Sequence, residues 1–554
     1  MSFSPSSAAG GIDFSLNPRR KPGAQVERIP FLDTDDDVHS SLDDDKSQSL
    51  RANFLPPAFS PSQLGAQDDN SADDWQVKEL TASSPVFTNL PQIKPSHLLV
   101  ASEETQKLRR KLLRGAKVLI VQAGYSGKRF IYERLKQLGV ELIIMDGPDS
   151  WARSLLDQGL IIDYLELDFT DYSTIFERAM RLVRRLDFSL DGVATYYEDA
   201  VPLAARIAYE LNLMSNPVSA CENARNKQKT RSCLKEKGLP VPNFYLIREK
   251  KDLYPAAQVV GFPAILKPVY GAASIGVYRV NDLEHLKEEF DQLVPLLDPK
   301  KDTIWAQGTE MLLEEYYDGD EFDVDLLLFG GQVVYSSISD NWACCEPWYQ
   351  ETGTNIPSLY PQDKQQQLVE FAKQCTLALG FVLGAFHVEV KYTSRGPRLI
   401  EVNARMGGMC VRDANLIAWG VDLVEEHMMA CLGIPIRPCI PQKPLAYLAE
   451  AAVNAPYSGI IDSDDWLQVL SDDPRTKVLR YLKRKGEIVR GPEDGMPDWI
   501  AEIICVSNVS GRDALEYMQA ALGEKLRVPI TPLEGRKRKN FFLPIHAHPF
   551  TLLK

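Results

Sequence analysis

Residues 387–408, HVEVKYTSRGPRLIEVNARMGG, carry side chains that could hold a cation at one point. Glu389 alternates with valines in a first predicted strand, and Glu401 and Asn403 share one face of a second, so the pair could present two carboxylates and an amide oxygen together. Such a set of oxygen donors suits Mg²⁺, which keeps several waters and is usually completed by nucleotide phosphates. A lone glutamate on a strand indicates a solvated surface, but this group, with Arg405 nearby, favours a site.

Two lysine-bearing segments upstream could bind phosphate. Lys267 ends a predicted strand, where it can meet a phosphate as a point charge. The turn after it, residues 271–274, contains only Gly, Ala and Ser, so its backbone N–H groups could wrap phosphate oxygens, although a plain hairpin would look the same. Lys227 begins a basic helix. The segment AGYSGK, residues 123–128, lacks the glycine spacing of a P-loop and is interpreted as an ordinary strand-to-helix turn.

Acidic residues also follow one predicted strand. Glu321, Asp323 and Asp325 alternate with apolar residues, a period of two that places the acids on one face. A solvated sheet face would show the same pattern. An adenosine site would also need a strand edge here for adenine and an acid for the ribose hydroxyls.

The elements that must position these residues alternate between strands and helices. AKVLIVQAG, a helically spaced segment and VELIIMDG predict a βαβ unit, and we expect a first α/β domain over residues 96–222. Residues 223–442 hold the candidate site and are expected to form a lid subdomain to about 305 and a central subdomain from about 306. Residues 443–554 are interpreted as an α/β appendage and tail.

Composition limits the function. The 554 residues carry a formal charge of −14, which argues against a nucleic-acid surface, and no apolar run is long enough to span a membrane. Nine scattered cysteines without a CxxC pair indicate reduced thiols and a cytoplasmic location. Residues 1–95 are rich in Ser, Pro and Asp and are predicted to be a disordered acidic arm, open to a partner that the sequence does not identify.

In this order, the motifs resemble the ATP-grasp superfamily over roughly residues 100–440. Within it, FDVDLLLFGGQVVYSSISDN, ETGTNIPS and EVNARMGGMCVRDANLIAWG are most similar to amino-acid ligases that form dipeptides, of the carnosine-synthase-like kind. Bacterial members tend to have a histidine three residues after the glutamate that matches Glu351, where this chain has Thr354. The resemblance implies an α/β (α+β) protein with an ATP-grasp fold preceded by a Rossmann-like domain.

The resemblance also implies roles for individual residues, beginning with those toward ATP. These are the phosphate lysines Lys227 and Lys267, a mobile phosphate loop with Gly271, Ala273, Ser274 and Gly276, an adenine hinge with Glu314, Glu315 and Tyr317, and the ribose acid Glu321. Two Mg²⁺ (or Mn²⁺) ions are implied on Glu389, Glu401 and Asn403.

Other roles concern the reaction and its substrates. Arg405 and Lys267 are implied as catalytic residues that neutralise the transferred group. The substrate residues are Glu351, Arg405, Gly407, Gly408 and Arg412. Glu351 could bind an ammonium or magnesium, and Arg412 could pair with a substrate carboxylate or within the protein.

The expected function is an ADP-forming ligase that joins two amino acids, β-alanine or similar and L-histidine or similar, through an acyl phosphate. A nucleotide-binding scaffold without ligase activity, and a ligase of another substrate class, are the alternatives. We expect small-molecule amino-acid substrates, neither nucleic acid nor membrane as partner, and leave a homo-oligomer open.

Overall fold

The computed structural model describes residue 86 and residues 98–533. The predicted acidic arm, except for residue 86, and the end of the predicted tail, residues 534–554, lie outside the described residues. No helix in the described part of the chain is both long and apolar enough to cross a membrane.

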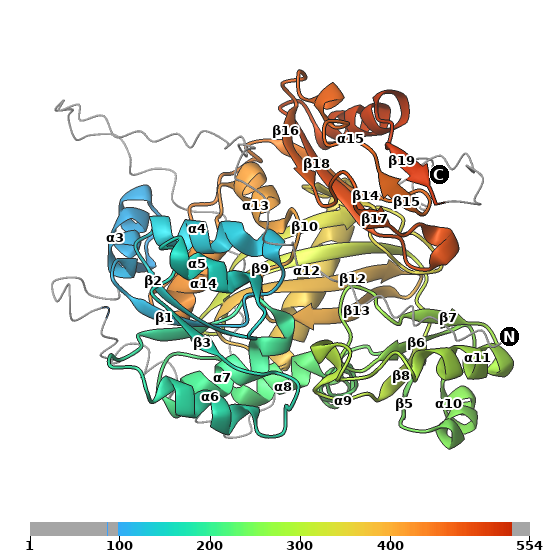
Figure 1. Ribbon diagram of the computed structural model, residues 1–554, viewed down its shortest axis with the longest axis horizontal. Coiled ribbons are helices and arrows are strands. Elements are labelled where there is room, and N and C mark those ends of the chain that lie inside the picture. The colour runs from blue at the N-terminus through green and yellow to red at the C-terminus, as the bar shows by residue number, and fades with distance from the viewer. Residues whose placement is uncertain (1–85, 87–97, 534–554) are drawn as a thin grey trace, which may run out of the picture. The chain divides into compact units, whose positions relative to one another are not determined.

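The first sheet is parallel, and it confirms the predicted βαβ unit. Its strands lie in the order β3-β2-β1-β4, with the bounds β1 (Lys117–Val121), β2 (Glu141–Asp146), β3 (Asp163–Glu166) and β4 (Gly192–Ala194). The helices of this region are α3 (Glu103–Leu113), α4 (Arg129–Gln137), α5 (Ser154–Asp157), α6 (Ile175–Val183) and α7 (Val201–Glu210). Helix α4 lies on one side of the sheet and α6 and α7 on the other, so apolar residues cover both faces (Figure 1).

A second, antiparallel sheet carries Lys267. It has the order β5-β8-β6-β7, with the bounds β5 (Phe244–Ile247), β6 (Ala264–Pro268), β7 (Tyr278–Val280) and β8 (Met311–Glu315). The helices α8 (Val218–Arg225) and α9 (Lys227–Glu236) precede it, and α10 (Leu253–Val260) and α11 (Leu283–Leu293) pack on it.

The third sheet has eight strands in the order β13-β12-β9-β10-β11-β14-β18-β16. Their bounds are β9 (Asp320–Phe329), β10 (Gln332–Asn341), β11 (Gly353–Ile356), β12 (Gly384–Thr393), β13 (Gly396–Asn403), β14 (Tyr447–Asn454), β16 (Thr476–Tyr481) and β18 (Trp499–Ser507). Strands from beyond residue 442 therefore continue the sheet that holds the candidate metal ligands. The helices between them are α12 (Gln362–Ala378), α13 (Val411–Trp419) and α14 (Leu423–Cys431).

The remaining elements follow β14 in the chain. They are α15 (Gly511–Ala520) and a three-stranded sheet, β17-β15-β19, with β15 (Gly459–Ile461), β17 (Ile488–Val489) and β19 (Ile530–Pro532).

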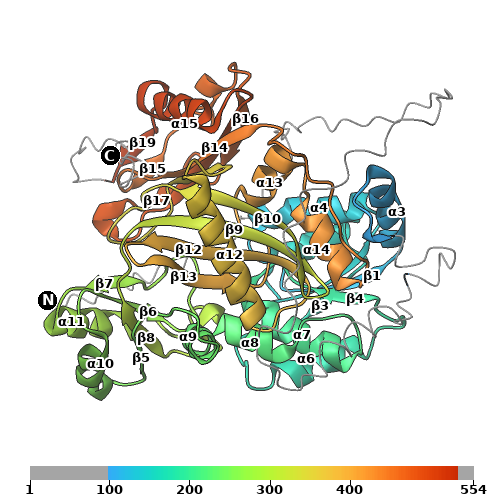
Figure 2. The same cartoon turned by 180° about the vertical axis from the view of Figure 1, so that it is seen from behind.

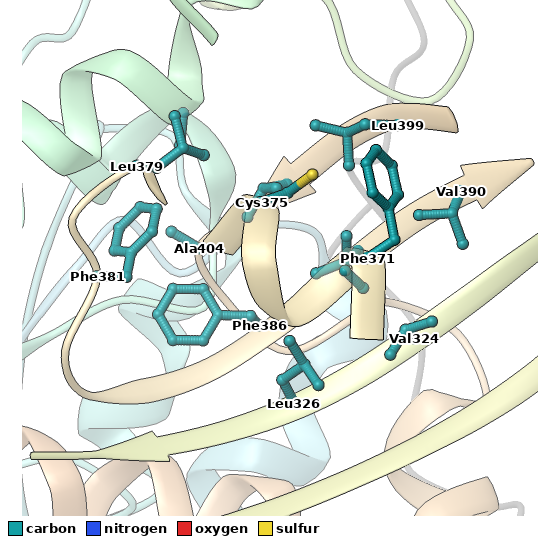
Figure 3. Close-up of a cluster of buried hydrophobic side chains, with 14 of the residues drawn as sticks. Val324, Leu326, Phe371, Cys375, Leu379, Phe381, Phe386, Val390, Leu399 and Ala404 are labelled. Carbon is teal, nitrogen blue, oxygen red and sulfur yellow. The ribbon is translucent and has the colours of Figure 1, made fainter. Parts of the chain in front are cut away.

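Helix α12 covers one face of the large sheet (Figure 2). Its Phe371 and Cys375 pack on Val324, Phe386 and Val390, all of which are buried (Figure 3). Because strand side chains alternate between faces, the acids of the same strands must project from the other face. The core thus fixes which face of β9, β12 and β13 is left for polar chemistry.

The turn between β8 and β9 depends on a glycine that lies against β12. Gly319 has φ +86, and a Cβ there would lie 2.0 Å from the carbonyl oxygen of Tyr392. Gly396, with φ +83 at the start of β13, has open space at the same position. The two glycines share the left-handed backbone and differ in steric room.

We expect Gly319→Ala to lower the free energy of unfolding more than Gly396→Ala. The second change costs only left-handed strain, about 1 kcal/mol, whereas the first adds about 1–3 kcal/mol to displace the β12 backbone. Urea unfolding of the two variants beside the wild type measures the difference. If both variants lost the same free energy of unfolding, the turn at Gly319 would accept a side chain without displacing β12.

Candidate active site

The polar face of the large sheet brings the predicted acids together. Glu389 on β12 lies opposite Glu401 on β13 and opposite Asp323 on β9. His387 lies opposite Asn403 and Asp325 in the same ladders. The predicted strands are confirmed, and their register places the side chains on neighbouring rungs.

Two of the three predicted metal ligands are hydrogen-bonded to each other, and the third lies opposite one of them in the ladder. The Nδ2 of Asn403 donates to Oε1 of Glu389 at 3.1 Å, and Oδ1 of Asn403 accepts from Nη2 of Arg405 at 3.2 Å. Glu401 forms an ion pair with Lys227, with 2.8 Å between Oε2 and Nζ.

The two carboxylates differ in their electrostatics. Burial and the charge of Glu401 hold the pKa of Glu389 well above its usual range. Burial alone would raise the pKa of Glu401 too, but Lys227, Lys267 and Arg225 outweigh it and lower that pKa to about 2. Like charges facing each other across strands destabilise a sheet unless a cation lies between them, so the donor set fits a hard divalent ion.

Each of the two predicted phosphate lysines forms an ion pair with a carboxylate, Lys227 with Glu401 and Lys267 with Glu314. Lys227 also donates from Nζ to the carbonyl oxygen of Gly271 at 3.0 Å, so one ammonium contacts both the loop and Glu401. Lys267 is buried and forms an ion pair with Glu314. Burial lowers the pKa of Lys267 despite that carboxylate.

The predicted phosphate loop has an uncommon backbone. Ala273 and Ser274 have φ of +50 and +56, and Gly276 has φ +75. The left-handed conformation costs an ordinary residue about 1–2 kcal/mol, and such residues gather at ligand-binding positions. The Oγ of Ser274 donates to the carbonyl oxygen of Tyr349 at 3.1 Å, which joins this loop to the segment that carries Glu351.

The residues predicted for the adenine hinge have different environments. Glu314 is buried, and its carboxylate accepts a hydrogen bond from Nε of Arg231 at 3.0 Å. The same carboxylate contacts Lys267, so two cations of the protein already engage it. The carboxylate of Glu315 pairs with Arg395 at 2.5 Å. Tyr317 is buried, and its hydroxyl has no hydrogen-bond partner among the described residues.

Glu321, predicted to bind ribose, lies on β9 opposite Lys391. Its pKa is raised by burial, against the lowering effect of Lys391. The side chain is half-buried and on the same face as Asp323, so the structure places it beside the acids of the site.

Arg405 and the glycines after it form a turn against the first sheet. The Nε of Arg405 lies 3.2 Å from Oε2 of Glu198, which follows β4. A Cβ at Gly407 would lie 2.6 Å from Val411 and 2.8 Å from Nδ1 of His387, so only glycine fits there. At Gly408 the nearest atom would be the Tyr125 hydroxyl, 3.9 Å away. The AGYSGK turn therefore lies beside the site.

Of the last two predicted substrate residues, Glu351 is solvent-exposed and Arg412 is not. Partial desolvation and the charge of Asp323 raise the pKa of Glu351 to about 7. Arg412 donates from Nε and Nη2 to Asp422 at 2.8 and 2.7 Å. The ion pair within the protein, one of the two alternatives for Arg412, is what the structure contains.

Sequence reasoning assigned no role to two residues that hold the site together. His387 bonds from Nδ1 to Asp325 at 2.8 Å, and although burial would lower its pKa, Asp323 and Asp325 raise it to about 10. Arg231 is fully buried and holds Glu314. The alternation of β12 signalled His387, whereas Arg231 has the sequence context of any exposed cation on a basic helix.

Comparisons with known proteins concern the family and the fold. Residues 260–413 match the model of a family described as an ATP-grasp domain, and residues 132–214 match that of an ATP-grasp N-terminal domain. A crystal structure of an L-amino acid ligase from Bacillus licheniformis superposes with a TM-score of 0.65 at 22% identity, covering 76% of this chain and 99% of that one. The chain therefore contains an ATP-grasp domain at residues 260–413. The expected ATP-grasp fold is thereby confirmed.

Two further relatives are informative. The chain is 32% identical to Carnosine synthase 1 of Homo sapiens over 392 residues, which are 68% of this chain and 46% of that protein. It thus resembles carnosine synthase but spans about half its length. The N5-carboxyaminoimidazole synthetase of Staphylococcus aureus, solved with ADP, superposes with a TM-score of 0.55 at 16% identity, over 74% of this chain and 97% of that one.

Glu314 gives the ATP-grasp site a testable dependence on pH. Burial alone would raise the pKa of Glu314, but Arg231 and Lys267 outweigh it and lower that pKa from 4.5 to about 2. A depressed carboxyl pKa stabilises the fold above about pH 4.5 and loses that effect as the pH falls toward 2.

We expect Glu314→Gln to lower the free energy of unfolding by about 3–5 kcal/mol at pH 7, because two buried cations lose their partner. The gap from the wild type should narrow as urea unfolding is repeated from pH 6 down to pH 3. Glu315→Gln, which removes a partly exposed ion pair, is the matched control and should cost under about 1 kcal/mol at every pH. A gap that is independent of pH would contradict the assigned pairing.

Proposed function

We propose that this chain is an ADP-forming carboxylate–amine ligase that joins two amino acids through an acyl phosphate. The observation that carries the proposal is the convergence of cations on the three oxygen donors of one polar face: Lys227 pairs with Glu401, Arg405 donates to Asn403, and Lys267 lowers the pKa of Glu401. A protein that only binds nucleotide needs the lysines but has no use for a guanidinium held beside the metal ligands.

In the first step, a substrate carboxylate attacks the γ-phosphate of ATP and ADP leaves. Glu389, Glu401 and Asn403 would hold one or two Mg²⁺ ions, which supply charge neutralisation on the phosphates. Lys227 and Lys267 add fixed positive charge to the nucleotide side. Arg405 contacts Asn403 and Glu198, and from there its charge would face the transferred group.

In the second step, a free amine attacks the acyl phosphate and phosphate leaves. The developing oxyanion would find Arg405 and the backbone N–H groups of Gly407 and Gly408. Water must be excluded or the acyl phosphate hydrolyses, which gives the loop 271–276 a purpose as a cover. The substrates proposed are β-alanine or similar and L-histidine or similar, on the likeness to carnosine synthase.

The proposal extends to organisation and location. We propose that residues 96–222 and 223–442 act as the pre-ATP-grasp and ATP-grasp domains, with residues 443–554 as the C-terminal part. A cytoplasmic location is proposed because all nine cysteines are free thiols.

ADP formation should require both a carboxylate and an amine substrate. Full-length protein, ATP and Mg²⁺ would be screened against β-alanine and the common amino acids in pairs, with ADP measured by a coupled assay and products by mass. The expected result is ADP stoichiometric with dipeptide for some pair. ADP formation that no pair stimulates would count against a ligase.

Arg405→Ala and Glu401→Gln should reduce turnover at least about 100-fold, since each removes charge stabilisation from the phosphoryl transfer. Both variants should remain folded by circular dichroism. Lys391→Ala, a change opposite Glu321 near the end of β12, serves as a control for a general loss of charge from this sheet face and should retain most activity. Wild-type rates in Arg405→Ala would remove the arginine from the mechanism.

A further inference from the structure

The backbone at Glu351 is held by two side chains from the C-terminal part of the chain. Nδ2 of Asn454, the last residue of β14, donates to the carbonyl oxygen of Glu351 at 2.9 Å. Nε1 of Trp499, the first residue of β18, donates to the same oxygen at 3.1 Å. A carbonyl oxygen has two lone pairs, so these two donors saturate it. We call Asn454 and Trp499 the clamp.

A bulge in the β14–β18 ladder brings the two clamp residues together. Val453 is paired with Ala501, but Asn454 is paired with Trp499, so Ile500 is an extra residue on β18. A bulge of this kind re-aims a side chain and is common next to active sites. Because paired residues point to the same face of a sheet, the bulge turns the indole of Trp499 to the face on which Asn454 lies.

Carbonyl oxygens fix the orientation of the Asn454 amide. Its Nδ2 donates to the carbonyl oxygen of Ala452 at 3.2 Å as well as to that of Glu351. An amide turned the other way would place its own oxygen against two acceptors. Oδ1 of Asn454 is buried and has no hydrogen-bond partner among the described residues. The donor group of Asn454, and not its acceptor, therefore holds this side chain in place.

The residues that follow Glu351 lie against the same strand. The carbonyl oxygen of Thr352 accepts from the backbone N–H of Ala452 at 3.0 Å. A Cβ at Gly353 would lie 2.3 Å from the carbonyl oxygen of Glu450, so the two backbones are in close contact. The chain is thus attached to β14 from Glu351 onward.

The side chain of Glu351 extends from this fixed backbone toward the site. It is solvent-exposed, and its carboxyl lies within electrostatic range of Asp323, His387 and Arg405. A binding group acts well only when its support is rigid, because a displacement of about 0.5 Å already weakens the fit. A loss of the contacts at the carbonyl oxygen would therefore reach the carboxyl of the same residue.

We propose that Asn454 and Trp499 are positioning residues for Glu351, and that the C-terminal part of the chain thereby sets the affinity for the amino-acid substrate that Glu351 contacts. This inference rests on the proposed ligase function. It gives the strands after residue 442 a role in substrate binding, although neither clamp residue carries a charge.

The test is steady-state kinetics of the full chain with the substrate pair that the ADP screen identifies. Trp499→Phe keeps an aromatic ring and removes the N–H donor, and Asn454→Asp keeps the size and replaces the donor by an acceptor. Each change should raise KM for one amino-acid substrate at least about fivefold, the effect of one hydrogen bond. The KM for ATP and kcat should stay within about twofold of wild type, because only the binding of one substrate is weakened.

Trp466→Phe is the matched control. Trp466 is a buried residue of the same C-terminal part, and its Nε1 has no hydrogen-bond partner among the described residues, so the change removes no hydrogen bond. It should leave each KM at the wild-type value. An unchanged KM in both clamp variants, an equal rise in the KM for ATP, or the same rise in Trp466→Phe would overturn the clamp.

Hydrogen exchange without substrates, followed by mass spectrometry, separates this inference from the ligase proposal. The backbone amides of residues 350–356 should exchange faster in Trp499→Phe than in wild type and in Trp466→Phe, and those of β9 should not change. Equal exchange in all three proteins would overturn the clamp, whatever the kinetics. If the wild type forms no ADP with any pair, the ligase function fails, while faster exchange in Trp499→Phe still supports the clamp on Glu351.

Discussion

The structure depends on two carboxylates that face each other across β12 and β13. Glu389 and Glu401 occupy paired positions in the ladder, and the apolar face behind them is sealed by α12, so neither can turn away. The sheet tolerates the pair because Lys227 neutralises the charge of Glu401. The raised pKa of Glu389 favours its protonated form unless a metal ion binds there. The cost of this like-charge pair explains why so many cations from other segments converge on it.

Those cations connect the sheets. Lys227 contacts Glu401 on the large sheet and the carbonyl oxygen of Gly271 in the phosphate loop. Arg225, from the preceding helix, donates to the same carbonyl oxygen at 3.2 Å and pairs with Asp199, which follows the first sheet. A displacement of the segment at Gly271 would therefore change the surroundings of Glu401, the predicted metal ligand. The side chains of Lys227 and Arg225 thus link the segment at Gly271 to Glu401 and to Asp199.

The sequence was sufficient for the parts that rest on local pattern. Alternation predicted the polar face of β9 and β12, and the βαβ unit followed from strand and helix periods. It could not show that Arg231 is buried against Glu314, because that pairing joins residues far apart in the chain. The same reason hid the continuation of the large sheet by β14, β18 and β16, since a strand pattern does not state its neighbours.

The site is electrostatically divided in a way that matches two different ligands. On one side, cations surround two carboxylates and lower both of their pKa values to about 2: Arg231 and Lys267 act on Glu314, and Lys227 and Lys267 act on Glu401. This side therefore has more cations than acids, which favours phosphate. On the other side, toward Glu351, acids dominate, and burial with mutual repulsion raises their pKa values.

The binding of a nucleotide alone would need only the side that is rich in cations. The buried acids of the other side would then only lower the stability of the fold. Carboxylates with raised pKa values beside carboxylates with lowered ones are the usual arrangement where one group must stay charged and another must meet a cation or exchange a proton. The turn at Arg405, Gly407 and Gly408 follows β13 and contacts it through the hydrogen bond from Arg405 to Asn403. The proposed ligase reaction rests on this division of charge, because one side offers cations to an anionic phosphate and the other offers acids to a cation.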